Sequence, residues 1–173
     1  MDVRYQGSLK AWSLPFPSID PQIILRSAEA FANYGVRFEY GHNVIFNRLP
    51  KAVAATAAIS GVFALAQLRI TRKWLLGLKD AGQGPSREAR QEAWFKVVIQ
   101  AQSSQDFIQV EVSGGDPGYE ETAKMLAESA LCLALDTPEN ALKGVITPAM
   151  AMGGNLIARL QRAGLIFKRV AAR

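Results

Sequence analysis

The feature that most constrains this chain is an uncharged run from Ala52 to Leu68, rich in alanine and interspersed with bulky apolar side chains. A helix built from such a run is apolar on every side, so it must be buried in protein or in lipid. The run is at the short limit for crossing a bilayer, which needs about 20 apolar residues, and its alanines weaken it further. We therefore expect a buried central helix, which could also line an apolar ligand pocket or a dimer interface.

A basic amphipathic helix is expected directly after this run, from Ile70 to Leu78, with Arg72 and Lys73 next to Trp74. The favoured interpretation is that its charged side is solvated. The alternative is a peripheral membrane or lipid-associated module, in which the apolar region 52–79 docks on an anionic membrane surface. Cations interleaved with tryptophan and leucine suit such a surface.

Composition bounds the remaining possibilities. The chain has 173 residues, 49% hydrophobic and 20% charged, which is typical of one globular domain, here expected to span 1–173. A single cysteine allows no intrachain disulfide, and the N-terminus has no secretory apolar run, so we expect a cytoplasmic protein. One histidine and one cysteine cannot supply an ordinary four-ligand zinc site. The net charge of +5 is a mild excess, and no nucleic-acid partner is expected, because the basic C-terminus lacks base-stacking aromatics.

The pattern of apolar residues predicts both helices and strands, and its clearest strand pair is an antiparallel hairpin connected through 102–106. Strands are expected at 36–46, 95–101, 108–112 and 165–170, and helices at 21–32, 52–68, 70–78, 119–135 and 148–163. This mixture favours the α+β class. We expect a single domain with a sheet of three or more strands, mixed or antiparallel, and helices packed mainly on one face.

The glycine-rich turn from Ser113 to Tyr119 lies between a predicted strand and a predicted helix, as a dinucleotide fingerprint does. It departs from that fingerprint because Ser113 stands at the first glycine position, Asp116 brings a negative charge and Pro117 lacks an amide hydrogen. The turn is therefore not expected to hold phosphates. Asp116 is expected to cap the following helix, and Tyr119 is a candidate for lining a substrate pocket.

His42 and Cys132 are the other candidates that the sequence offers. His42 shares the apolar face of its predicted strand with Tyr40, where it is either a hydrogen-bonded core residue or a substrate-facing acid or base. The core interpretation is favoured, because no carboxylate lies on that face. Cys132 lies among leucines in its helix and is expected to be an inert core thiol.

A set of short segments spread over the chain forms a recognisable pattern. The segments are Leu14–Ile23, Arg26–Ala28, Tyr40–His42, Phe63–Gln67, Gly114–Tyr119, Glu121–Leu131, Ile146–Pro148 and Ala151–Gly153. Together they resemble the C-terminal part of the saccharopine dehydrogenase-like oxidoreductases, above all the bacterial branch that includes the trans-acting enoyl reductases. The resemblance extends from about Leu9 to Val170.

This resemblance implies a two-part enzyme. In the family, an N-terminal domain binds NAD or NADP, and a C-terminal α+β domain shapes the substrate side and often the dimer contact. The chain begins near the start of the second part, so we expect a fragment or a split half, inactive alone and binding no cofactor by itself. A homodimer or a separate dinucleotide-binding chain is the expected partner. No catalytic residue of the family is matched, and His42, Asp116 and Tyr119 are candidates for the substrate side only.

Overall fold

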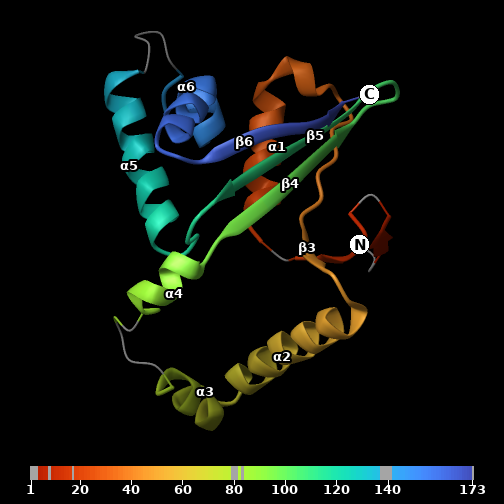
Figure 1. The fold of residues 1–173 in the computed structure, drawn as a ribbon, viewed down its shortest axis with the longest axis vertical. Helices are drawn as coiled ribbons and strands as arrows, with labels where there is room; N and C mark the ends of the chain where they lie inside the picture. The colour runs from red at the N-terminus through yellow and green to blue at the C-terminus, as the bar shows by residue number, and fades with distance from the viewer. Residues whose placement is uncertain are drawn as a thin grey trace. The chain divides into compact units, whose positions relative to one another are not determined.

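The computed structural model of the protein describes residues 4–7, 9–16, 18–78, 82, 84–136 and 142–172. The chain divides into two compact units, 1–83 and 84–173. Each unit contains one antiparallel three-stranded sheet together with its helices (Figure 1). The α+β class predicted from the sequence is confirmed, with two small sheets rather than one.

The sheet of the first unit consists of three short strands in the order β1-β2-β3. These strands are β1 (Arg4–Gln6), β2 (Ala11–Pro15) and β3 (Asn43–Phe46). Ala11 and Ser13 of the central strand are buried, whereas Trp12 points the other way and meets the ring of Tyr5 edge-on at 5.6 Å. This alternation is the period of two that a strand imposes on its side chains.

The sequence predicts one long strand at 36–46, but only 43–46 form a strand, β3. The prediction is wrong for 36–42. Gly35 has φ 73°, so the chain turns directly after the 3₁₀ helix η1 (Ala32–Tyr34), and Val36 is fully exposed. The ring of Phe38 packs edge-on against Tyr34 at 4.8 Å. The alternating aromatic residues therefore make local ring contacts rather than one face of a sheet.

Three helices complete the first unit, namely α1 (Asp20–Ala30), α2 (Leu49–Gln67) and α3 (Arg69–Leu76). Ala52 is the only buried residue of α2, while Val62 and Phe63 are more than half exposed. The expectation of a buried central helix is thus wrong. Within the described residues, α2 is the one helix long and apolar enough to cross a membrane.

The second unit is built on the hairpin that the sequence predicts. Strands β4 (Phe95–Gln102), β5 (Phe107–Gly114) and β6 (Ile166–Ala172) form an antiparallel sheet in that order, with a register irregularity between Gln109 and Val110. The short helix α4 (Arg87–Glu92) precedes the hairpin, and the Ser86 hydroxyl caps it by accepting from the amide of Ala89.

The longer helices of this unit, α5 (Glu120–Leu135) and α6 (Pro148–Arg162), lie side by side (Figure 1). Helix α6 begins with the hydroxyl of Thr147 accepting from the amide of Met150, and it is kinked at Gly153, which has φ 49°. The buried apolar side chains described in this unit are those of Cys132, Met152 and Leu160 on these helices and Leu165 just after α6.

Candidate functional site

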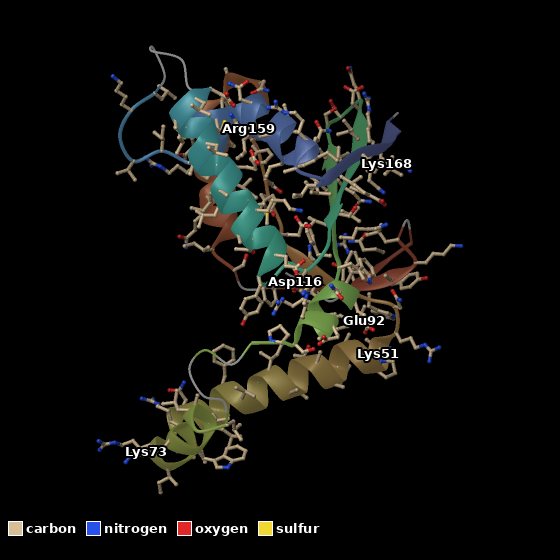
Figure 2. All side chains as sticks on the ribbon, turned by 60° about the vertical axis from the view of Figure 1, so that its left-hand side comes forward. Lys51, Lys73, Glu92, Asp116, Arg159 and Lys168 are labelled. Carbon is tan, nitrogen blue, oxygen red and sulfur yellow. The ribbon has the colours of Figure 1, made fainter. Side chains whose placement is uncertain are left out.

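The turn between β5 and α5 is organised by the carboxylate of Asp116, which is 6% exposed and lies at the N-terminal end of α5 (Figure 2). Its Oδ2 accepts from the amides of Tyr119 at 2.8 Å and Glu120 at 3.1 Å, and its Oδ1 accepts from Gly118 at 3.4 Å. These are helix-start donors that lack partners within the helix. Asp116 therefore accepts hydrogen bonds from the start of α5, as predicted, but Tyr119 occupies the N-cap position and the helix begins at Glu120 rather than at Pro117.

The pKa of Asp116 reflects this arrangement. Burial alone would raise it, but hydrogen bonds from the amides of Glu120, Tyr119 and Gly118, together with the charge of Arg90, lower it below the ordinary value. The carboxylate is consequently held ionised and in place. Because it occupies the amides that open α5, no donor set remains at this turn for a pyrophosphate, and the residues present do not fit the phosphates of a dinucleotide.

The glycines of the turn serve close packing. A Cβ atom on Gly114 would lie 2.8 Å from the ring of Phe95 and 3.3 Å from the side chain of Glu121. Glu121 is buried, and its Oε1 accepts from the amide of Gly115 at 3.2 Å. Lys124 Nζ lies 2.8 Å from both carboxylate oxygens of Glu121. The sequence offered an i,i+3 spacing for this ion pair, but our sequence analysis did not single it out.

Tyr119 is half exposed and packs against the loop before α4. A Cβ atom on Gly84 would meet the phenol oxygen of Tyr119 at 3.0 Å, so the ring lies close over this glycine. In the same region, Arg90 Nε lies 3.6 Å from Glu120 Oε1. Tyr119 therefore helps to join α4 to the start of α5, and its exposed edge is available to a ligand.

His42 has the partner that our sequence analysis did not find. Its Nδ1 lies 3.3 Å from Asp20 Oδ2 at the start of α1, and the hydroxyl of Tyr40 lies 3.3 Å from the same nitrogen. The hydroxyl of Ser18 donates to Asp20 Oδ2 at 3.0 Å, which orients the carboxylate. The ring of Phe16 lies 6.0 Å from the imidazole, centre to centre.

This cluster of Ser18, Asp20, Tyr40 and His42, called here the His42 cluster, has a defined chemical capacity. A carboxylate at Nδ1 favours the tautomer that leaves Nε2 free to exchange a proton. Among the described residues, no hydrogen-bond partner lies at Nε2, and the side chain of His42 is 29% exposed. The imidazole is therefore oriented, accessible and capable of acid or base chemistry.

The pKa of Tyr40 is raised above its ordinary value, first by burial and then by the negative charge of Asp20. The phenol consequently stays protonated at neutral pH and can donate a hydrogen bond. His42 lies in the first unit, whereas Asp116 and Tyr119 lie in the second. The three predicted substrate-side residues thus belong to two separate local structures.

Two further features of the second unit bear on function. Cys132 is buried, and burial, followed by the charge of Asp136, raises the pKa of its thiol, in line with the inert core cysteine expected. The second feature is an apolar hollow of about 390 Å³ lined by Leu133, the residue after Cys132, and by Ile146 and Met152 among others. No cluster of metal-ligating side chains is found among the described residues.

Comparison with known proteins relates the chain to enzymes of one kind. It is 32% identical over 157 residues to a trans-acting enoyl reductase of Mycobacterium leprae, 30% over 157 residues to one of Mycobacterium ulcerans and 31% over 144 residues to one of Mycobacterium bovis. The matches cover 83%, 83% and 77% of this chain, but 37%, 37% and 34% of those relatives.

The chain is thus a distant, partial homologue of the trans-acting enoyl reductases, and it spans a little over a third of their length. No family model matches the chain. No solved structure matches it either.

Proposed function

We propose that this chain forms the substrate side of a nicotinamide-dependent enoyl reductase of the saccharopine dehydrogenase-like type. The observation that carries this proposal is the identity of 30–32% to trans-acting enoyl reductases over about four fifths of the chain. The turn before α5 is not built for phosphates, so NAD or NADP is assigned to another domain or chain. The cytoplasmic location stays a prediction.

The substrate class follows from the relatives and from the local chemistry. An enoyl group is an unsaturated acyl chain, and the apolar hollow beside α5 and α6 offers a lining that such a chain would favour. Reduction of a carbon–carbon double bond also requires a proton. The imidazolium form of His42 is the proposed donor. With Nδ1 facing Asp20 it carries a proton on the accessible Nε2, and loss of that proton leaves the neutral ring protonated at Nδ1.

The first test asks whether the chain binds an enoyl substrate without binding the nicotinamide cofactor. Calorimetric titration of the chain with a 2-enoyl thioester is expected to give binding, and titration with NADPH is expected to give none. Micromolar affinity for NADPH without affinity for the thioester would contradict the proposal directly.

The second test joins the chain to the part of a relative that the match does not cover and asks whether the fusion reduces the thioester. The fusion is expected to oxidise NADPH only when the 2-enoyl thioester is present. His42→Gln is expected to lower that rate roughly 100-fold, as removal of a general acid does. Gln102→Ala, at the exposed end of β4, is the matched control. Equal rates in the two variants would remove His42 from the proposal, and a fusion without thioester reduction would remove the substrate class.

A further inference from the structure

Helices α2 and α3 form a connected arm, residues 49–76, whose apolar surface is left uncovered by the described residues of the first unit. Of the bulky apolar side chains on α2, Val53, Ile59, Val62 and Phe63 are all more than half exposed. Ala58, Ile59, Val62 and Phe63 line a shallow apolar hollow on this helix. A contiguous apolar patch of this kind marks an interaction surface.

The corner between the two helices is held by side chains of α3. The chain is extended at Leu68, and the next helix starts at once. The hydroxyl of Thr71 donates to the carbonyl oxygens of Leu65 and Leu68, and Arg72 Nε donates to the carbonyl oxygen of Ala66 at 2.9 Å. These bonds satisfy the carbonyls that α2 leaves open at its end. The arm therefore presents both helices in one fixed arrangement.

Helix α3 divides into an apolar and a cationic face. Ile70 and Trp74, four residues apart, are 86% and 60% exposed, so they form one apolar ridge. Arg69 and Lys73, also four residues apart, form an exposed cationic ridge beside it. Lys73 lies on α3 and Lys51 at the opposite end of α2 (Figure 2). Tryptophan next to cations is the composition of helices that lie at a membrane interface.

The charged side chains of the α2–α3 arm and its flanking residues are all positive. From Tyr40 to Lys79 the sequence contains no acidic residue, whereas it contains the cations Arg48, Lys51, Arg69, Arg72, Lys73 and Lys79. A symmetric contact with a second copy would bring these cations together without any anion to balance them. An anionic occupant that also accepts apolar side chains therefore suits the arm better than a second copy does.

We propose that the α2–α3 arm docks the protein on an anionic lipid bilayer, with Ile70, Trp74 and the apolar side chains of α2 inserted below the headgroups. Cations stand at both ends of α2, so both ends are held at the level of the phosphates and the arm lies in one leaflet. The membrane interpretation of the sequence accounts for the exposure of α2. The proposal does not depend on the reductase assignment.

The test is co-sedimentation of the full chain with vesicles of phosphatidylcholine, with or without phosphatidylglycerol. Binding is expected only to the anionic vesicles and is expected to weaken as salt is raised. Arg69→Gln with Lys73→Gln is expected to lower the partition coefficient roughly 30-fold, because each cation contributes about a fivefold factor at such a surface. The control, Lys168→Gln with Arg169→Gln on β6, removes the same charge from another exposed site and is expected to change binding less than about threefold.

A second pair of variants tests the apolar insertion. Trp74→Ala is expected to lower binding about tenfold or more, whereas Trp94→Ala, which removes an even more exposed ring elsewhere, is expected to leave it nearly unchanged. In a variant that keeps only Trp74, anionic vesicles are expected to shift the emission to the blue, and brominated lipid is expected to quench it. Far-UV circular dichroism of each variant checks that the helices still form.

Three results overturn the proposal. The first is absence of binding to anionic vesicles, and the second is an equal loss in the α3 double variant and in its β6 control. The third is resistance of vesicle-bound protein to alkaline carbonate extraction, since that would show a helix crossing the bilayer. Where the first result is accompanied by a dimer in sedimentation, the arm is assigned to a second copy.

Discussion

Arg159 on α6 forms a two-bond ion pair with Asp136 at the end of α5. Its Nε donates to Asp136 Oδ2 and its Nη2 donates to Asp136 Oδ1 at 3.2 Å, while Nη1 donates to Glu128 Oε2 at 3.2 Å. The side chain of Arg159 is 14% exposed, so little water competes for these bonds. The guanidinium thus joins α6 to two points of α5, and it is the main described polar link between these helices.

Replacement of Arg159 by methionine is expected to loosen the contact between α5 and α6. Asp136 and Glu128 would lose their partner while remaining partly covered. Cys132 is the single cysteine of the chain and lies one turn before Asp136, so its reaction with a thiol reagent reports opening of this contact. We expect labelling on the order of tenfold faster than in the unaltered chain.

Arg162→Met is the matched control for this variant. It lies on the same helix, and its Nε contacts only the carbonyl oxygen of Ala158 among the hydrogen bonds described. Labelling of Cys132 in this variant is expected to stay within about twofold of the unaltered chain. Equal acceleration by both substitutions would show that general helix stability, rather than the pair with Asp136, protects the thiol.

The pH dependence of this ion pair has a definite sign. The hydrogen bond from Arg159, although burial opposes it, holds the pKa of Asp136 below its ordinary value. A carboxyl group with a lowered folded pKa stabilises the fold above its unfolded value of about 3.9 and loses that contribution as the pH falls through the folded pKa. The difference in the free energy of unfolding between Arg159→Met and the unaltered chain should therefore be largest near neutral pH. It should shrink in acid, as measured from urea unfolding at a series of pH values.

Asp116→Ala removes the acceptor for three amides at the start of α5. The carboxylate that these amides contact is buried, and the substitution would remove three hydrogen bonds from the start of α5. The expected result is a melting temperature lower by roughly 3–8 °C, with the loss confined to pH above about 4, because the lowered pKa of Asp116 makes its contribution vanish in acid. Asp116→Asn, which keeps an acceptor oxygen, should recover part of the loss. A full loss with asparagine would show that the charge, rather than the acceptor, matters.

Gly114→Ala tests the packing reason for the glycine at the end of β5. The added methyl group would lie 2.8 Å from the Phe95 ring, closer than carbon atoms approach in proteins. We expect a destabilisation of about 1–3 kcal/mol in urea unfolding, which Phe95→Leu should partly reverse by opening space. Gly154→Ala on α6 is the control, because its Cβ would meet nothing within 4 Å, and it should be neutral or slightly stabilising.

The sequence predicted well those features that depend on contacts between residues close to one another in the chain. The hairpin of β4 and β5 follows from a period of two on both sides of a short polar loop, and Asp116 accepts hydrogen bonds from the start of α5 because the acceptors and donors lie within four residues. The two strands β1 and β2 were missed, because they are short and the second one ends at Pro15. Such strands exist only by pairing with each other and with β3, which no local pattern encodes.

Long-range features account for the remaining differences. Asp20 and His42 lie 22 residues apart, so their contact depends on how α1 returns to the segment before β3. Our sequence analysis therefore described His42 as lacking a carboxylate. The exposure of α2 was missed for a related reason. The rule that an apolar helix is buried presupposes a core to receive it, and the first unit covers Ala52 alone.

The phenol of Tyr40 is partly buried and lies near the carboxylate of Asp20. Both raise the pKa of the phenol, and burial is the larger cause. A phenol with a raised folded pKa stabilises the fold fully below its unfolded value of about 10 and loses that contribution as the pH rises through the folded pKa. The chain should therefore become less stable in this alkaline range, and Tyr40→Phe should remove that part of the loss. Tyrosinate absorbance followed during a pH titration should lose a component that appears above the ordinary range of a phenol in Tyr40→Phe. Asp20→Asn should lower the pKa of Tyr40 only slightly, because the desolvation remains. A large decrease would show instead that the charge of Asp20 dominates the His42 cluster.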